Sequence, residues 1–138
     1  FMRALVTDVY GIPEEQILGT YNKTKFVYNN GKPYIKRLPE IAFIDDKEGK
    51  PENIHKVIGK KPIFAAGNSD GDLAMMQWTA SSKHKSFMLY VHHTDEVREW
   101  AYDRDSHVGS LDKGLDQAKK DGWTLVDMKN EWKVIYPQ

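Results

Sequence analysis

Oxygen-bearing side chains crowd into residues 67–72, where Asn68, Asp70 and Asp72 lie within five positions of one another. Hard cations such as Mg²⁺ are bound in proteins through oxygen, often by one or two carboxylates together with water and a substrate phosphate. Gly67 and Gly71 would let the backbone turn sharply around such an ion. The same residues also suit the start of a helix, with Asp70 as its cap and Asp72 favoured by its dipole. By themselves, residues 67–72 are compatible with either a magnesium site or a helix cap.

Two further groups have side chains that suit a phosphorylated ligand. Lys47 and Lys50 lie in the charged run at residues 45–51, and a lysine ammonium is a compact charge that suits phosphate. His92 and His93 follow an apolar run, where imidazoles would contact a substrate or assist proton transfer. A solvated loop and an exposed, capped turn are the plainer interpretations of these two groups.

The elements that must position these residues alternate between strand and helix. Apolar periodicity and turn residues predict strands at 62–66, 87–91 and 123–128, the first two buried on both faces, and helices at 2–10, 52–58, 73–79, 96–102 and 111–120. Asn30 and Gly31 favour a tight turn, so residues 25–36 are expected to form a β-hairpin. Residues 132–136 are expected to form a closing strand or a tail.

This order predicts an α/β fold with a parallel sheet and helices on its faces, in a single domain spanning residues 1–138 with a hairpin segment at 20–40. Ligands of such sheets bind beyond the carboxyl ends of the strands. The rule selects residues 67–72 and residues 92–95, which adjacent parallel strands would bring to one rim.

Composition excludes several classes of function. The 138 residues are 40% hydrophobic, which allows a real core, and they include no cysteine, which excludes disulfides and thiolate sites. Twenty basic and twenty acidic residues balance, so neither a nucleic-acid partner nor a membrane partner is expected. No apolar run approaches the length of a membrane span.

Three segments together resemble the haloacid dehalogenase (HAD) superfamily, in particular its phosphoserine-phosphatase-like branch. They are residues 6–20, residues 49–54 beginning Gly-Lys-Pro, and residues 67–75 with the sequence Gly-Asn-Ser-Asp-Gly-Asp-Leu-Ala-Met. The resemblance implies a Rossmann-like, HAD-like parallel sheet with a small hairpin insertion. Residues 91–95 and 101–107 are more loosely similar to a bacterial subgroup that is often exported, which implies a periplasmic or exported location, with the cytoplasm as the alternative.

The resemblance also implies the roles of the candidate residues. Lys50 matches the lysine that stabilises the nucleophile and binds the phosphoryl group, so it is expected to be both catalytic and substrate-binding. Residues 67–72 match the acidic motif that binds Mg²⁺, with Asn68, Asp70 and Asp72 as ligands and Asp72 also catalytic. His92 and His93 are expected to contact a small phosphorylated substrate. The implied reaction is Mg²⁺-dependent hydrolysis of a phosphomonoester through an aspartyl-phosphate.

Two departures from the family pattern qualify that expectation. Asn68 stands where the family most often has an aspartate, which removes a negative charge from the metal site. No apolar run ends in Asp-x-Asp-x-Thr, and the Asp103–Asp105 pair follows a helical pattern instead. The nucleophile and the phosphate-binding Ser or Thr are therefore expected upstream of Phe1, in a sheet that is incomplete at its N-terminus, and the chain alone is expected to be inactive.

Two alternative functions stay open from the sequence. One is a non-catalytic domain that binds Mg²⁺ or phosphate, and another is a phosphotransferase of the same fold. An incomplete sheet would also expose an edge strand, through which two copies would pair as a homodimer.

Overall fold

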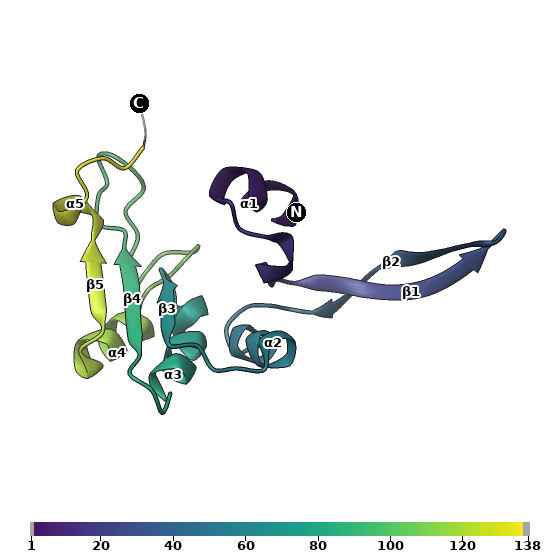
Figure 1. The fold of residues 1–138 in the computed structure, drawn as a ribbon. Coiled ribbons are helices and arrows are strands. Elements are labelled where there is room, and N and C mark those ends of the chain that lie inside the picture. Colours follow the sequence, from purple (N-terminus) through teal and green to yellow (C-terminus); the bar gives the residue numbers. More distant parts are fainter. Residues whose placement is uncertain (1, 137–138) are drawn as a thin grey trace.

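A computed structural model of the chain describes residues 2–136 (Figure 1). Its first half consists of α1 (Arg3–Tyr10), the short 3₁₀ turn η1 (Glu14–Gln16), β1 (Tyr21–Asn29), β2 (Lys32–Phe43) and α2 (Gly49–Ile58). Its second half consists of β3 (Phe64–Gly67), the 3₁₀ turn η2 (Asp70–Asp72), α3 (Leu73–Ala80), β4 (Phe87–His92), α4 (Lys113–Asp121), β5 (Thr124–Asp127) and α5 (Met128–Glu131). The predicted α/β class is thus observed, as a parallel sheet flanked by helices together with a separate antiparallel hairpin.

The parallel sheet has the strand order β3-β4-β5, with Ala65 opposite Met88 and Tyr90 opposite Leu125. One face of this sheet carries the core. Tyr90 is completely buried there against Met76 of α3 and Leu115 of α4. The helices α3 and α4 therefore cover the same face, as right-handed crossovers require when strands are added in one direction.

The opposite face of the sheet is open, and its residues are apolar. Phe64 and Phe87 stack on it with their ring centroids 5.8 Å apart, and they remain 55% and 48% exposed. The prediction that both strands are buried on both faces is therefore wrong. β3 also lies at an edge of the sheet, because β4 is its partner on one side and no described strand pairs with the other side.

The hairpin of β1 and β2 is confirmed and is longer than predicted. Its turn places Asn30 and Gly31 at positive φ of 48° and 75°, as the sequence indicates for a tight turn. The hairpin extends away from the parallel sheet (Figure 1). Residues 21–43 contain five basic side chains and one acidic one, whereas the rest of the chain contains fifteen basic and nineteen acidic side chains. The neutral chain is thus strongly polarised in charge.

One predicted element differs in the structure, and one open expectation is decided by it. The predicted helix at residues 96–102 is wrong, because residues 96–98 form one turn and the chain then continues as a loop. Val97 and Trp100 are 85% and 81% exposed, so a helix there would have had no packed apolar face. Residues 132–136 form a tail after α5, as the second of the two expectations for this segment has it. Within residues 2–136, no helix is both long and apolar enough to cross a bilayer.

Candidate functional site

Lys50 and Asp72 meet directly, although twenty-two positions separate them in the sequence. The Lys50 Nζ lies 2.6 Å from Asp72 Oδ1, and the two side chains are 29% and 7% exposed. Lys50 stands in the first turn of α2, and Asp72 ends η2 at the start of α3. Lys50 and residues 67–72, which the sequence expectation brings together, therefore converge beyond the carboxyl end of β3.

The Asp72 carboxylate is held on its other oxygen by the backbone. Oδ2 accepts hydrogen bonds from the N–H of Asn68 at 3.0 Å and of Ser69 at 3.3 Å, in a capping box with Ser69. Gly67 makes this approach feasible, because a Cβ at that position would lie 2.5 Å from the Asp72 carboxylate. The glycine that precedes the polar turn is thus needed to let the carboxylate lie against the strand.

The start of α2 depends on a second close approach. A Cβ on Gly49 would lie 2.2 Å from the Ile44 carbonyl oxygen, so only glycine lets the chain fold back before Lys50. The same loop brings in Asp46, whose Oδ1 lies 2.8 Å from the position of a Cβ on Gly71. Sequence reasoning missed Asp46, although its position just after the hairpin and four residues before Lys50 was available as a signal.

Asp70 is engaged differently from its neighbours. Its two carboxylate oxygens accept the backbone N–H groups of Asp112 at 3.0 Å, Lys113 at 3.0 Å and Gly114 at 2.8 Å, at the start of α4. The predicted helix-cap role therefore applies to Asp70, but to α4, a helix more than forty residues away, and not to the helix that follows it in sequence. Its oxygens face that helix terminus, which leaves Asp72 and Asn68 as the predicted ligands nearest to Lys50.

Tyr90 places a hydroxyl beneath these carboxylates. The side chain is completely buried, and among the described residues its Oη is the one buried side-chain oxygen or nitrogen without a hydrogen-bond partner. Burial, and next the negative charges of Asp72 and Asp70, raise the pKa of Tyr90. The hydroxyl therefore stays protonated and has a hydrogen bond to donate.

A chain of contacts links the polar turn to His93. The Asn68 amide donates to the Tyr102 hydroxyl, and the Tyr102 ring stacks on the His93 imidazole with centroids 4.4 Å apart. His93 Nδ1 lies 2.8 Å from Glu99 Oε1, and the Glu99 side chain is 8% exposed. Burial raises the pKa of Tyr102, against the lowering effect of the Asn68 hydrogen bond. Tyr102 and Glu99 are two residues of this region that the sequence did not single out.

His92 is directed elsewhere. Its Nε2 lies 3.0 Å from Asp103 Oδ2, on the side of β4 opposite to His93. Among residues 2–136, no hydrogen bond or ion pair connects His92 with Lys50, Asn68 or Asp72. The two adjacent histidines that the sequence grouped together are therefore separated by the alternation of the strand.

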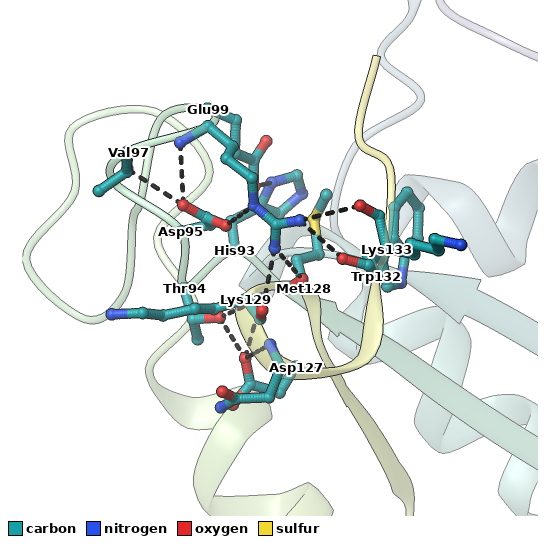
Figure 2. A network of polar contacts seen from close by, with 12 residues as sticks. His93, Thr94, Asp95, Val97, Glu99, Asp127, Met128, Lys129, Trp132 and Lys133 are labelled. Carbon is teal, nitrogen blue, oxygen red and sulfur yellow. Dashed lines mark hydrogen bonds and ion pairs between the residues drawn. The ribbon is translucent and has the colours of Figure 1, made fainter. Parts of the chain in front are cut away.

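Arg98 links the loop after β4 to the C-terminal segment through hydrogen bonds and an ion pair. Figure 2 shows Asp95 of that loop beside Met128, Lys129, Trp132 and Lys133. The Arg98 guanidinium pairs with Asp95, which is 2% exposed, and donates to four backbone carbonyl oxygens of the C-terminal segment. Those carbonyls belong to Met128, Lys129, Trp132 and Lys133. Hydrogen bonds, above all from the Arg98 backbone N–H, lower the pKa of Asp95. We call this network of Arg98, Asp95 and the four carbonyls the C-terminal clasp.

The donor set suits a hydrated Mg²⁺ site more than a closed protein cage. No group of three His, Cys, Asp or Glu side chains suitable for a metal occurs in residues 2–136. Mg²⁺, however, usually keeps several waters and needs only one or two carboxylates together with phosphate oxygens. Asp72 supplies one carboxylate and the Asn68 side chain supplies one amide oxygen, which fits that requirement.

Comparison with known proteins does not assign this site. No known protein family and no curated protein matches the chain.

Proposed function

We propose that the chain is the Mg²⁺- and phosphate-binding part of a HAD-like phosphomonoester hydrolase. In the proposed reaction an aspartate that these residues do not supply attacks phosphorus, and water then hydrolyses the aspartyl-phosphate. The observation that supports the proposal best is the 2.6 Å contact of Lys50 with Asp72 beyond the end of β3. In this contact an ammonium group meets a fixed carboxylate at one rim, and the backbone N–H of Asn68 donates to the same carboxylate.

Each residue has a stated part in the proposal. The Lys50 ammonium stabilises the charge on the phosphoryl oxygens, and Asp72 keeps that ammonium in place. Asp72 and the Asn68 amide would hold Mg²⁺, which when bound neutralises phosphate oxygens. Asp70 is left out of the ligand set because its oxygens face the start of α4, where they accept three N–H groups, whereas Asp72 contacts Lys50 directly. His92 is left out as well, because it pairs with Asp103.

The binding half of the proposal is tested by titrating the chain with inorganic phosphate, with and without Mg²⁺, and following ³¹P line widths and shifts by NMR. We expect phosphate binding that depends on Mg²⁺ and that Lys50→Met abolishes. Lys60→Met, which removes an exposed lysine just beyond α2, is the matched control and is expected to bind like the parent chain. Phosphate binding that is equal in both variants, or that is absent from the parent chain, would overturn the proposal.

A non-catalytic domain that binds Mg²⁺ or phosphate is the second candidate. One observation favours it: among the described strands, only β5 ends at an aspartate, Asp127. That carboxylate caps α5 by accepting the N–H groups of Lys129 and Asn130, so it is already used as a helix cap. Both candidates predict that the 138-residue chain releases no phosphate from p-nitrophenyl phosphate with Mg²⁺. Turnover like that of a complete phosphatase would show that a nucleophile lies within the chain, and transfer to added alcohols would identify a phosphotransferase.

A further inference from the structure

A pocket of about 490 Å³ opens on the uncovered face of the sheet, beside the candidate phosphate site. Its floor comes from the ends of β3 and β4, and its wall comes from the C-terminal segment. Most of its lining is apolar: Ala66, Val91, Met128, Trp132, Ile135 and Tyr136. This volume and this apolar lining are typical of sites for small organic molecules.

The polar groups of the pocket gather at one end. Asn68, His93 and Glu99 line that end, and neither lysine nor arginine is among the described residues that line the pocket. Glu99 is nearly buried and is paired with His93 Nδ1, so its charge is already engaged. The pocket thus offers one imidazole and one amide for hydrogen bonds, and neither a lysine nor an arginine to pair with an anion.

The pocket and the candidate phosphate site share a residue. Asn68 lines the pocket, and its backbone N–H also donates to Asp72 Oδ2. Lys50 contacts Oδ1, the other oxygen of the same carboxylate. A ligand that spans both places would have its phosphate near Lys50 and its body in the pocket. The C-terminal clasp keeps the wall in place, because Arg98 binds the Trp132 carbonyl directly (Figure 2).

We infer that this pocket binds the leaving group of the substrate, and that this leaving group is an uncharged, mainly apolar alcohol of aryl or branched-alkyl type. That the ligand is a leaving group rests on the proposed function. That the pocket binds a neutral, mainly apolar alcohol does not. A carboxylate on the leaving group is disfavoured, because it would enter a mainly apolar pocket beside Glu99, where no lysine or arginine lines the pocket and His93 already pairs with Glu99. Amino-acid phosphates such as phosphoserine are therefore disfavoured as substrates.

The experiment uses three phenols of matched size and different charge: 4-hydroxybenzyl alcohol, 4-hydroxybenzoate and tyramine. Their binding to the chain is measured by saturation-transfer NMR and by calorimetry, without Mg²⁺ or phosphate. We expect the neutral phenol to bind at least about tenfold more tightly than the anion, a difference that corresponds to roughly 1.4 kcal/mol. Tyramine is expected to bind more weakly than the neutral phenol. Preference for either charged phenol, equal binding of the three, or no binding would overturn the inference.

Two variants and one control locate the binding. Trp132→Ala should weaken binding of the neutral phenol about tenfold, whereas Trp100→Ala, on the exposed loop, should leave it unchanged. Glu99→Gln should narrow the gap between the anion and the neutral phenol, which a merely structural role of Glu99 would not do. Circular dichroism checks that each variant folds, and a Trp132→Ala variant that binds normally would contradict the inference. These measurements omit Mg²⁺ and phosphate, so the two proposals are tested separately. Failure of the phosphate titration with phenol binding intact would contradict the proposed function alone. Failure of phenol binding with phosphate binding intact would contradict the pocket assignment alone.

Discussion

Asp72 accepts one ammonium and two backbone N–H groups, so its charge is compensated on both oxygens. The carboxylate is only 7% exposed, so these three donors, more than water, compensate its charge. Removing one partner of a pair such as Lys50 and Asp72 leaves a charge with too little solvation. The residues that would bind a phosphate therefore also stabilise the fold.

Lys50→Met should lower the free energy of unfolding by about 2 kcal/mol, less than the loss for a fully buried pair because Lys50 is partly exposed. Urea denaturation followed by circular dichroism measures the change. Lys60→Met should stay within about 0.5 kcal/mol of the parent chain, as exposed substitutions generally do. An unchanged midpoint for Lys50→Met would mean that the Lys50–Asp72 contact contributes little in solution.

Asp70→Ala should cost about 1–2 kcal/mol, because it leaves the first N–H groups of α4 without their acceptor. The same variant should keep its Mg²⁺-dependent phosphate binding when it is measured below its unfolding transition. Asp105→Ala, at an exposed position, is the control for stability. Loss of metal binding without loss of stability would instead return Asp70 to the ligand set that the sequence predicted.

At the scale of elements, the clasp decides where the loop after β4 and the tail after α5 lie. One guanidinium satisfies carbonyls on both sides of the end of α5, and this replaces the regular pairing that a closing strand would have provided. The pocket wall is built by this arrangement. The loop that carries Glu99 and Tyr102 begins at the same anchor, because the Glu99 N–H donates to the Asp95 carbonyl.

The clasp should weaken in acid. The pKa of Asp95 is lowered below 3.8 in the folded chain, so its contribution to stability is present above that pH and is lost as the pH falls toward the lowered value. The protection of the amide hydrogens of residues 128–133, measured as hydrogen exchange corrected for its intrinsic pH dependence, should therefore fall below about pH 4. In Asp95→Asn this protection should be low already at neutral pH and should change less with pH. Protection that is high and equally independent of pH in both chains would contradict the role of Asp95.

The sequence predicted the elements whose signals are local, and it predicted the convergence of Lys50 with residues 67–72. The helices α1, α2, α3 and α4, the tight turn at Asn30 and Gly31, and the parallel strands all follow from periodicity and turn residues. Distant contacts could not be predicted in this way. Asp70 caps a helix far along the chain, and the loop at residues 96–102 depends on what Arg98 meets in the C-terminal segment. Phosphatase chemistry, the metal and the substrate stay predictions.

At the scale of the whole molecule, the sheet presents an apolar face and an unpaired edge together. β3 lies at the edge, and the exposed Phe64 and Phe87 rings lie on the open face. Edge strands with exposed apolar residues favour pairing with another chain. The two features place the expected self-association on one side of the molecule.

Size-exclusion chromatography with light scattering should show dimers that increase with concentration. Phe64→Lys should shift the chain toward monomer, because a charged side chain on an edge strand opposes pairing. Val97→Lys places the same charge on the exposed loop and should have no such effect. A parent chain that stays monomeric at every concentration would rule out this association.

The basic hairpin and the acidic remainder of the chain should orient the molecule on a charged surface. Five cationic side chains against one anionic side chain on the arm, with the opposite excess elsewhere, make the neutral chain a large electric dipole. Near neutral pH it should be retained by both cation- and anion-exchange resins at low ionic strength, each resin holding the opposite end, and modest salt should release it from both.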